Sequence, residues 1–291
     1  MRSRFALLIV FRFAVLLCVM FAAACSTRDS APSSHPSPQS TRALPDDNLN
    51  AVVWVQRAVE YRASALQAFR AAQQQLDAAL ETPTWTAAIE QTAAAGLPPA
   101  VVLDVDETVL DNSYYQARMV RNATTYSEQT WSSWVEERQA TAIPGAVEFT
   151  RYAAERRVAI FFVTNRTKES EPPTRANLSA LGFPLDPEID TVLTRGERPE
   201  WQASTKGPRR AYIGEKYRIL LLIGDDLGDF VADAGGTTEQ RAARTAPYDD
   251  RWGRQWIMVP NPTYGSWERA VIGASTDPTE AKRRALLIEP R

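Results

Sequence analysis

The sequence predicts an α/β fold built on a parallel sheet that is flanked by helices. Apolar runs at 101–103, 158–163 and 218–223 have the length and composition of buried strands. Segments with helical periodicity or with proline in a first helical turn lie before, between and after these runs. Strands that alternate with helices in this way indicate parallel strands covered by helices on both faces.

The length and composition fit one large domain with a small insertion. The chain has 291 residues, of which 44% are hydrophobic and 23% are charged. The formal net charge of −2 argues against a nucleic-acid polymer as partner, because proteins that bind such polymers usually carry a basic face. The sequence contains no internal repeat, and it does not define an oligomeric state.

Residues 1–24 have the three parts of a secretory signal peptide. Arg2 and Arg4 lie at its start, an apolar run follows, and small residues end it. A transmembrane anchor is the alternative. Arg12 interrupts the apolar run, however, and leaves less than the roughly 20 residues that a membrane span needs. We therefore expect residues 1–24 to be removed.

The segment AAAC at 22–25 resembles the cleavage site of bacterial lipoproteins, although Ala22 stands where leucine is more usual. By this resemblance, Cys25 carries lipid and anchors the protein in the cell envelope, and Ser26 directs it to the outer membrane. The alternative is a secreted protein with a free thiol at Cys25. Because Cys18 lies in the signal peptide, the exported body cannot form a disulfide.

Residues 25–45 are rich in serine and proline and predict a flexible tether. The body that follows, residues 46–291, is expected to begin with one long amphipathic helix, for which Asp46, Asp47 and Asn48 are candidate N-caps. The apolar face of this helix is predicted to consist of Val52, Val55, Val59, Leu66 and Phe69.

The rest of the body continues the alternation of helices and strands. The segment 112–142 is aromatic and polar without a strong period, which indicates an insertion after the first strand. The further elements expected are a helix after Pro144, a helix from Pro172 to near Gly182, a short strand at 191–194, a helix at 207–216 and a strand at 256–259.

Chemically active side chains gather where the predicted strands end. Parallel α/β sheets bind their ligands at the carboxyl ends of the strands. Lys206 precedes the helix that leads into the strand at 218–223, so we expect its ammonium in the same crevice. The strand ends carry, in order, Asp104, Asp106 and Thr108; then Thr164, Asn165 and Arg166; then Asp225, Asp226 and Asp229.

Carboxylates with waters form the kind of oxygen site that Mg²⁺ prefers. The chain has one histidine, His35, and it lies in the predicted tether. A Ser-His-Asp triad, a histidine-phosphate enzyme and a histidine-ligated zinc hydrolase are therefore excluded. An aspartate nucleophile that forms an aspartyl-phosphate remains.

Four motifs, DVDETVLDN, VTNR, KGPR and GDDLGDF, are similar in order and spacing to those of the haloacid dehalogenase (HAD) superfamily. The stretches TWSSWVEERQATAIPGAVEF and VPNPTYGSWE extend the likeness to nearly all of 48–275. The chain most resembles the class C (DDDD-type) acid phosphatases, bacterial lipoproteins active on phosphomonoesters and 5′-nucleotides. The resemblance implies a HAD-like core, a phosphatase domain at 46–291 and a cap insertion at 112–142.

Chemistry and resemblance together imply the catalytic roles. Asp104 is expected to attack phosphorus and to ligate Mg²⁺ with its other oxygen. Asp106 is expected to act as general acid and then as general base, which is consistent with an acid pH optimum, and its backbone carbonyl is expected to reach the metal. Thr164, with Asn165 and the amides beside it, is expected to bind the transferring phosphoryl group, and Lys206 to offset its charge.

The remaining polar residues carry supporting roles or open alternatives. Asp225 is expected to complete the metal site, and Asp229 to orient the ligands from behind. Asp226 either shares that supporting role or caps a helix. Arg166 and Arg209 either bind the substrate phosphate or are ordinary solvated arginines.

Aromatic side chains in the insertion suggest the kind of leaving group. By the resemblance, Trp131 and Tyr264 sandwich a nucleotide base, a contact worth roughly 1–3 kcal/mol per base in nucleic-acid systems. Trp134 and Trp267 either face the crevice or pack the insertion onto the core. The expected substrate is a 5′-nucleotide or nicotinamide mononucleotide, with other aromatic phosphomonoesters close behind.

The leading prediction is thus a Mg²⁺-dependent acid phosphatase tethered to a membrane. One alternative is a non-catalytic surface lipoprotein that binds nucleotides or metal, which would require a broken motif where none is broken. A second alternative is a phosphotransferase on the same fold, which would share every motif.

Overall fold

The computed structural model describes residues 48–288, which lie within one compact unit, Pro45–Arg291. The predicted signal peptide, the tether and Cys25 lie outside the described residues. No helix between residues 48 and 288 is both long enough and apolar enough to cross a bilayer.

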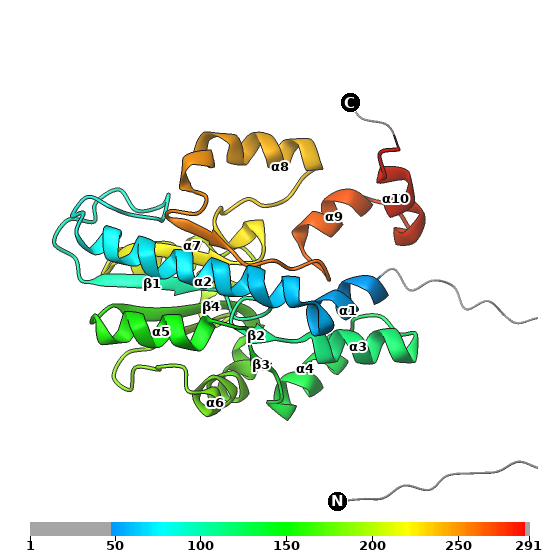
Figure 1. Ribbon diagram of the computed structural model, residues 1–291, viewed down its shortest axis with the longest axis horizontal. Coiled ribbons are helices and arrows are strands. Elements are labelled where there is room, and N and C mark those ends of the chain that lie inside the picture. The colour runs from blue at the N-terminus through cyan, green and yellow to red at the C-terminus, as the bar shows by residue number, and fades with distance from the viewer. Residues whose placement is uncertain (1–47, 289–291) are drawn as a thin grey trace, which may run out of the picture. The chain divides into compact units, whose positions relative to one another are not determined.

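A five-stranded parallel sheet forms the centre of the protein (Figure 1). Its strand order is β5-β4-β1-β6-β7, so β1 lies between β4 and β6. The alternating pattern of the sequence is therefore confirmed, and the fold is α/β. The strands are β1 (Pro99–Leu103), β4 (Ala159–Thr167), β5 (Val192–Arg195), β6 (Arg218–Gly224) and β7 (Trp256–Met258).

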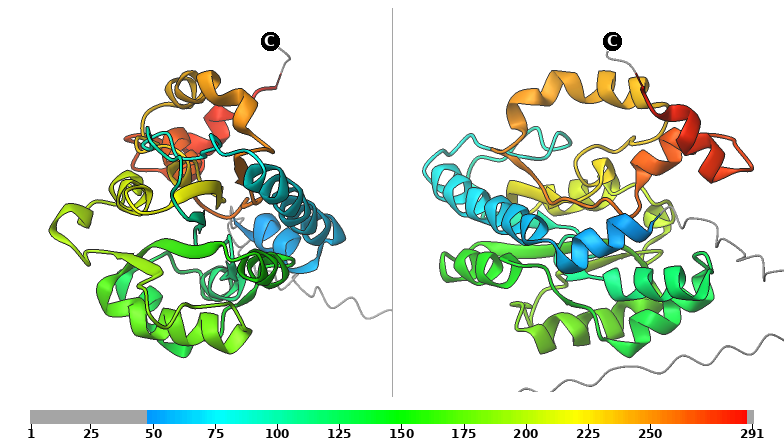
Figure 2. Two further views of the ribbon diagram at one scale, coloured as in Figure 1. Left: turned by 90° about the vertical axis from the view of Figure 1, so that its left-hand side faces the viewer. Right: turned by 45° about the vertical axis from the view of Figure 1, so that its right-hand side comes forward.

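Helices cover both faces of the sheet, and consecutive side chains of β1 point to opposite faces. Val101 and Leu103 join the core under α2 (Val59–Leu80) and α5 (Ala146–Glu155), where the rings of Phe69 and Phe149 lie 5.9 Å apart. Val102 joins a second core with Ile213 of α7 (Gly207–Gly214). Figure 2 shows α2 and α7 on opposite sides of the sheet.

The predicted long N-terminal helix is two helices. Ala58 adopts an extended conformation, with ψ of 131°, between α1 (Leu49–Arg57) and α2 (Val59–Leu80). The break rotates the apolar face, so Val59 is 75% exposed and was wrongly assigned to that face. The buried line along α2 instead consists of Tyr61, Ala65, Phe69, Ala72, Leu76 and Ala79.

The predicted N-cap position of this first helix is confirmed for Asn48, but its side chain does not make the expected capping hydrogen bond. Its amide nitrogen donates instead to Oε1 of Gln116, at 3.1 Å. The side chain therefore joins α1 to the segment after the first strand.

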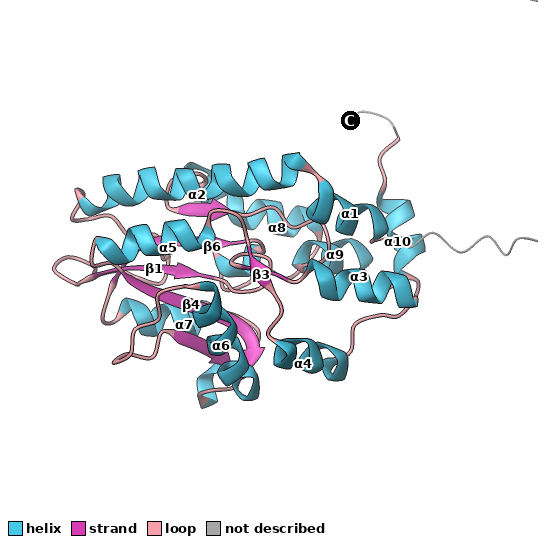
Figure 3. Cartoon of the chain, turned by 60° about the horizontal axis from the view of Figure 1, so that its bottom comes forward, coloured by secondary structure: helices cyan, strands magenta, loops and turns pink. Residues whose placement is uncertain are grey.

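That segment, the cap insertion at 112–142, contains the helices α3 (Ser113–Asn122) and α4 (Glu128–Glu137). Both helices are short, and each buries few residues, which is why the sequence showed no strong period there. The strands β2 (Leu110–Asp111) and β3 (Thr141–Ala142) pair antiparallel at its base. Figure 3 shows α3 and α4 beyond the carboxyl ends of the sheet strands.

The remaining helices complete the fold. The helix α6 (Glu171–Leu181) has prolines in its first turn and ends at Gly182, whose φ of 83° suits glycine, as the sequence predicted. The C-terminal part contains α8 (Thr238–Thr245), α9 (Ser266–Ile272) and α10 (Pro278–Ala285). The 3₁₀ helices are η1 (Lys168–Ser170), η2 (Pro199–Trp201), η3 (Leu227–Asp229) and η4 (Ala246–Arg251).

Candidate active site

A cavity of about 850 Å³ opens at the carboxyl ends of β1, β4 and β6. This is the place where a parallel sheet is expected to bind its ligand. Among the predicted site residues within the described part of the chain, Thr164 alone does not line it. The predicted residues that do line it are Asp104, Asp106, Trp131, Asn165, Lys206, Asp225, Asp226, Asp229 and Tyr264.

Asp104 and Lys206 are in direct contact inside this cavity. The ammonium of Lys206, which lies at the N-cap of α7, donates to Oδ1 of Asp104 and, at 2.6 Å, to Oδ1 of Asp229. Burial raises the pKa of Asp104 to about 7, because the positive charge of Lys206 offsets only part of the lost solvation. Burial also disfavours the charge of Lys206, but the two carboxylates outweigh it and raise its pKa.

Asp225 lies at the end of β6 and is held on both of its oxygens. Thr108 donates to Oδ1 at 2.9 Å, and the amide of Asn261 donates to Oδ2 at 2.8 Å. Burial raises the pKa of Asp225 well above its ordinary value, and the negative charge of Asp104 raises it further. Asn261 is a site residue that sequence reasoning missed, although it lies in the quoted stretch VPNPTYGSWE.

The three carboxylates of Asp104, Asp225 and Asp229 form a cluster with an oxygen-only donor set. One oxygen from each lies within 4.8 Å of the other two. Such a set suits a hard divalent cation. A cation would also relieve the repulsion that raises the pKa values of Asp104 and Asp225.

Asp106 is not a member of this cluster, and its carboxylate is held by an arginine. Arg166 donates to Asp106 from Nη2 at 2.8 Å and from Nε at 3.0 Å. Asn112 donates to the same Oδ1 at 3.0 Å. Of the two alternatives that the sequence left for Arg166, the ordinary solvated arginine is wrong, because only 1% of its side chain is exposed.

A second buried arginine, Arg209, fixes the segment after β4. Its guanidinium donates to the carbonyl oxygen of Thr164 and, at 2.6 Å, to Oδ1 of Asn165. The solvated alternative is again wrong, because Arg209 is fully buried, and burial lowers its pKa to about 10. Thr164 itself is buried, and its hydroxyl oxygen accepts from the amide of Arg166 at 3.1 Å.

Asp226 takes the capping role that the sequence left open. Its Oδ1 accepts from the amide of Gly228 at 2.9 Å and from the hydroxyl of Ser266 at 2.7 Å. Asp229 completes a capping box by accepting from the amide of Asp226 at 3.0 Å. Burial opposes the charge of Asp226, but these hydrogen bonds outweigh it and lower its pKa. Asp226 therefore joins η3 to the start of α9.

Glu107 is a site residue that sequence reasoning did not single out. It adopts a positive φ of 58°, which is uncommon for a residue other than glycine. Its buried carboxylate accepts from the hydroxyl of Tyr264 and, at 3.0 Å, from the amide of Asn112. The contact fixes the ring of Tyr264 at the cavity wall. The sequence offered only a weak signal, the position of Glu107 between Asp106 and Thr108.

The tryptophans of the two aromatic stretches differ in their surroundings. Trp131 is half-buried at the cavity, 5.2 Å from the ring of Tyr115, and the guanidinium carbon of Arg166 lies 5.5 Å from its ring centre. Trp134 is 2% exposed and packs the cap insertion onto the core. Trp267 is 39% exposed on α9, so neither alternative proposed for it holds.

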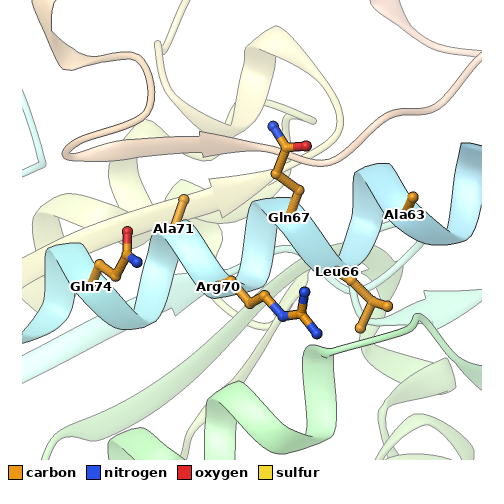
Figure 4. Close-up of a pocket in the computed structure, with 6 residues that line it drawn as sticks. All are labelled: Ala63, Leu66, Gln67, Arg70, Ala71 and Gln74. Carbon is orange, nitrogen blue, oxygen red and sulfur yellow. The ribbon is translucent and has the colours of Figure 1, made fainter.

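A second hollow, of about 460 Å³, lies on the outer side of α2. It holds no carboxylate, nucleophile or metal-binding group, so it offers no chemistry. Its lining residues are Ala63, Leu66, Gln67, Arg70, Ala71 and Gln74 (Figure 4).

The chain is similar to proteins of known family and structure. Residues 25–267 match the protein family described as HAD superfamily, subfamily IIIB (acid phosphatase). Two solved structures of the class C acid phosphatase from Bacillus anthracis, one with tungstate bound, are 30% and 31% identical to the chain. They cover 84% of this chain and 98% of the Bacillus protein, with TM-scores of 0.73 and 0.72.

Plant proteins are more distant relatives. The stem 31 kDa glycoprotein of Glycine max and acid phosphatase 1 of Solanum lycopersicum are each 25% identical to the chain, over 135 and 136 residues. These alignments cover 46% of this chain. The chain spans about half the length of these plant relatives, 53% and 52%.

Proposed function

The chain belongs to the acid phosphatases of HAD subfamily IIIB, and from this premise we propose that it hydrolyses phosphomonoesters with the help of Mg²⁺. The observation that carries the proposal is the convergence of Asp104, Asp106 and Asp225 on one cavity, with Lys206 against Asp104. Such convergence of buried charges is costly unless it serves a ligand.

In the proposed reaction, a carboxylate oxygen of Asp104 bonds to phosphorus while the bond from phosphorus to the leaving oxygen breaks. Asp106 gives its proton to that leaving oxygen. Asp106 then takes a proton from a water molecule, whose oxygen displaces Asp104 from phosphorus and yields phosphate. The contact between Lys206 and Asp104 supports this assignment, since it places a positive charge beside the transferring group.

The proposed Mg²⁺ would be held by the carboxylates of Asp104 and Asp225 and by the backbone carbonyl of Asp106. When bound, the ion supplies positive charge next to the phosphoryl oxygens. Asp229 has both carboxylate oxygens engaged, one by Lys206 and one by the amide of Asp226. Its ion pair with Lys206 supports a role in orienting that ammonium beside the metal ligands.

Thr164 and Asn165 follow β4 and are proposed to bind the transferring phosphoryl group through the hydroxyl, the amide side chain and the neighbouring backbone N–H groups. The contacts of Arg209 support this role, because they hold both residues in one position.

A 5′-nucleotide or nicotinamide mononucleotide is the proposed substrate class. Trp131 and Tyr264 line the cavity that holds Asp104, which gives an aromatic base two rings to contact. The hydrogen bond from Tyr264 to Glu107 supports the assignment, because a ring with a fixed orientation loses less entropy on binding.

The protein is further proposed to be lipidated at Cys25 and anchored in the cell envelope, at the outer membrane. Mass spectrometry of the mature N-terminus tests this, since the lipidated form begins at Cys25 and carries acyl chains. A mature protein that begins elsewhere, or a bare thiol at Cys25, would exclude it.

The function itself is tested by phosphate release from a 5′-nucleotide and from p-nitrophenyl phosphate between about pH 4 and 8, with Mg²⁺ or with EDTA. We expect release by the wild type with Mg²⁺ and none by Asp104→Asn. No release by a folded, Mg²⁺-loaded wild type would favour a binding protein. Transfer of phosphate to an added alcohol in preference to water would favour a phosphotransferase.

A further inference from the structure

Asn112 lies at the N-cap of α3 but does not cap this helix. Asparagine at an N-cap usually accepts a hydrogen bond from a backbone amide of the first turn. The side chain of Asn112 makes no such bond. The carboxylate of Asp111 accepts from the amide of Ser113 instead, at 2.8 Å. A fully buried amide is thus available for another purpose.

The amide nitrogen of Asn112 faces the acid that is proposed to move the proton. Its Nδ2 donates to Oδ1 of Asp106 at 3.0 Å. Oδ1 also accepts from Nη2 and Nε of Arg166, at 2.8 and 3.0 Å. The other oxygen, Oδ2, has one contact among the described residues, a longer one of 3.3 Å from Nε of Arg166. Oδ1 is therefore occupied, and Oδ2 is the oxygen with room for a proton.

Trp134 of the cap insertion, together with a longer contact of 3.5 Å from Nη2 of Arg166, determines which end of the Asn112 amide faces Asp106. Its indole Nε1 donates to Oδ1 of Asn112 at 2.8 Å. An indole nitrogen can only donate a hydrogen bond, so it requires the carbonyl oxygen of the amide on its side. The NH₂ group must then face the opposite side, where the carboxylates of Asp106 and Glu107 lie.

We infer that Asn112 is a positioning residue for the general acid, and that Trp134 orients it. The inference rests on the proposed function, because it assigns proton transfer to Oδ2 of Asp106. With Asn112 in place, Oδ1 stays against Arg166 and Oδ2 faces the leaving oxygen. Without it, Arg166 is the one remaining donor to the carboxylate among the described residues, Oδ1 is held less firmly, and proton delivery to the leaving group becomes slower. Phosphoryl transfer to Asp104 needs this help only when the leaving oxygen is strongly basic.

The test compares two small aromatic esters that differ in the basicity of the leaving oxygen. p-Nitrophenyl phosphate releases a stable phenolate that needs little protonation, whereas benzyl phosphate releases an alkoxide that needs a proton. The value of kcat/KM reports steps up to departure of the leaving group. We expect Asn112→Ala to lower kcat/KM for benzyl phosphate at least ~10-fold more than for p-nitrophenyl phosphate, a part of the roughly 10²–10⁴-fold that general acid catalysis supplies.

The matched control is Asn177→Ala. Asn177 is also a buried asparagine, and its amide donates to the carbonyl of Ala140 at 3.0 Å, away from Asp106. We expect the ratio of the two kcat/KM values to stay at its wild-type value in this variant. If Asn112 had a purely structural role, Asn112→Ala would lower kcat/KM for both substrates by the same factor, and that outcome would overturn the inference.

Trp134→Phe keeps the buried ring and removes only the indole donor. We expect it to change the substrate ratio in the same direction as Asn112→Ala, by about 3-fold. Its control is Trp256→Phe, which removes a buried indole donor bonded to the carbonyl of Ala87 at 2.9 Å. If Asn112→Ala lacks a cooperative melting transition, the comparison of Trp134→Phe with Trp256→Phe replaces it. A ratio of the two kcat/KM values that is unchanged in Trp134→Phe then refutes the inference.

The wild type separates this inference from the proposed function. A wild type that hydrolyses neither ester contradicts the phosphatase proposal itself. A wild type that hydrolyses both, with equal losses in Asn112→Ala, leaves the phosphatase proposal intact and removes only the positioning role.

Discussion

Arg166 and Asp106, 60 residues apart in the sequence, form an ion pair in which Nη2 of the buried arginine donates to Oδ1 of the half-buried aspartate at 2.8 Å. The arginine also donates from Nε to both carboxylate oxygens, at 3.0 and 3.3 Å. This geometry uses the planar fork of the guanidinium, which a lysine ammonium cannot reproduce. The pair therefore holds the carboxylate plane as well as its charge.

Replacing Arg166 by lysine is expected to lower kcat/KM. Arg166→Lys keeps a positive charge near Asp106 but loses the contacts that orient the carboxylate, so we expect a decrease of roughly 10–100-fold. Steady-state kinetics with benzyl phosphate measure it. Arg156→Lys, in a surface pair with Asp77 at 3.0 Å, serves as control and should change kcat/KM by less than about 2-fold. Equal effects in the two variants would contradict a catalytic role for Arg166.

The metal-free protein is expected to lose stability as the pH rises from about 4 to about 7. The folded-state pKa of Asp104 is raised from 3.8 to about 7, so folding is favoured while this group is protonated and less so once it ionises. Asp104→Asn removes that loss. In EDTA at pH 8 we expect the variant to have a free energy of unfolding about 1–3 kcal/mol above that of the wild type.

Urea unfolding at pH 5 and pH 8 measures this difference. Asp226→Asn is the opposite case, because the pKa of Asp226 is lowered in the folded state. The ionised carboxylate therefore stabilises the fold at pH values above its ordinary pKa, and this stabilisation is lost in acid. We therefore expect Asp226→Asn to destabilise the protein at pH 8. If the wild type and Asp104→Asn have the same free energy of unfolding at pH 8 without metal, then ionisation of Asp104 does not destabilise the folded protein.

Mg²⁺ is expected to stabilise the folded protein against heat. At 100 times its Kd, a ligand that binds only the folded state adds about 3 kcal/mol to the free energy of unfolding. Asp225→Asn removes one carboxylate of the cluster and should abolish most of this gain. Thermal melts with EDTA and with added Mg²⁺ provide the measurement. Asp250→Asn, an exposed carboxylate outside the cavity, should respond as the wild type does. An undiminished response in Asp225→Asn would place the metal elsewhere.

Trp131 is expected to determine the preference for aromatic leaving groups. Trp131→Ala removes a ring that lines the cavity, so we expect KM for a 5′-nucleotide to rise roughly 10-fold or more. KM for glycerol phosphate, which has no ring, should change little. Trp267→Ala removes an exposed tryptophan that does not line the cavity and should affect neither substrate. A proportional change of both KM values in Trp131→Ala would assign Trp131 to packing alone.

Sequence reasoning worked best where the signal was local. The strand β1 and the acids after it could be predicted because three consecutive apolar residues, 101–103, followed by aspartates already describe a buried strand that ends at a polar site. It failed at Ala58, where one extended residue divides the expected helix. The hydrophobic periodicity did not predict that break, since α1 and α2 are each amphipathic on their own.

The sequence by itself determined the alternation of helices and strands, the family and the set of acids at the strand ends. Each of these follows from a short pattern of residues that lie close together in the chain. Only the tertiary structure decided how these acids are held. Arg166 and Asn112 converge on Asp106, Trp134 donates to Asn112, and Tyr264 donates to Glu107 from 157 residues away. A buried polar group must find its hydrogen-bond partner wherever the folded chain brings one, and no local pattern in the sequence records that choice.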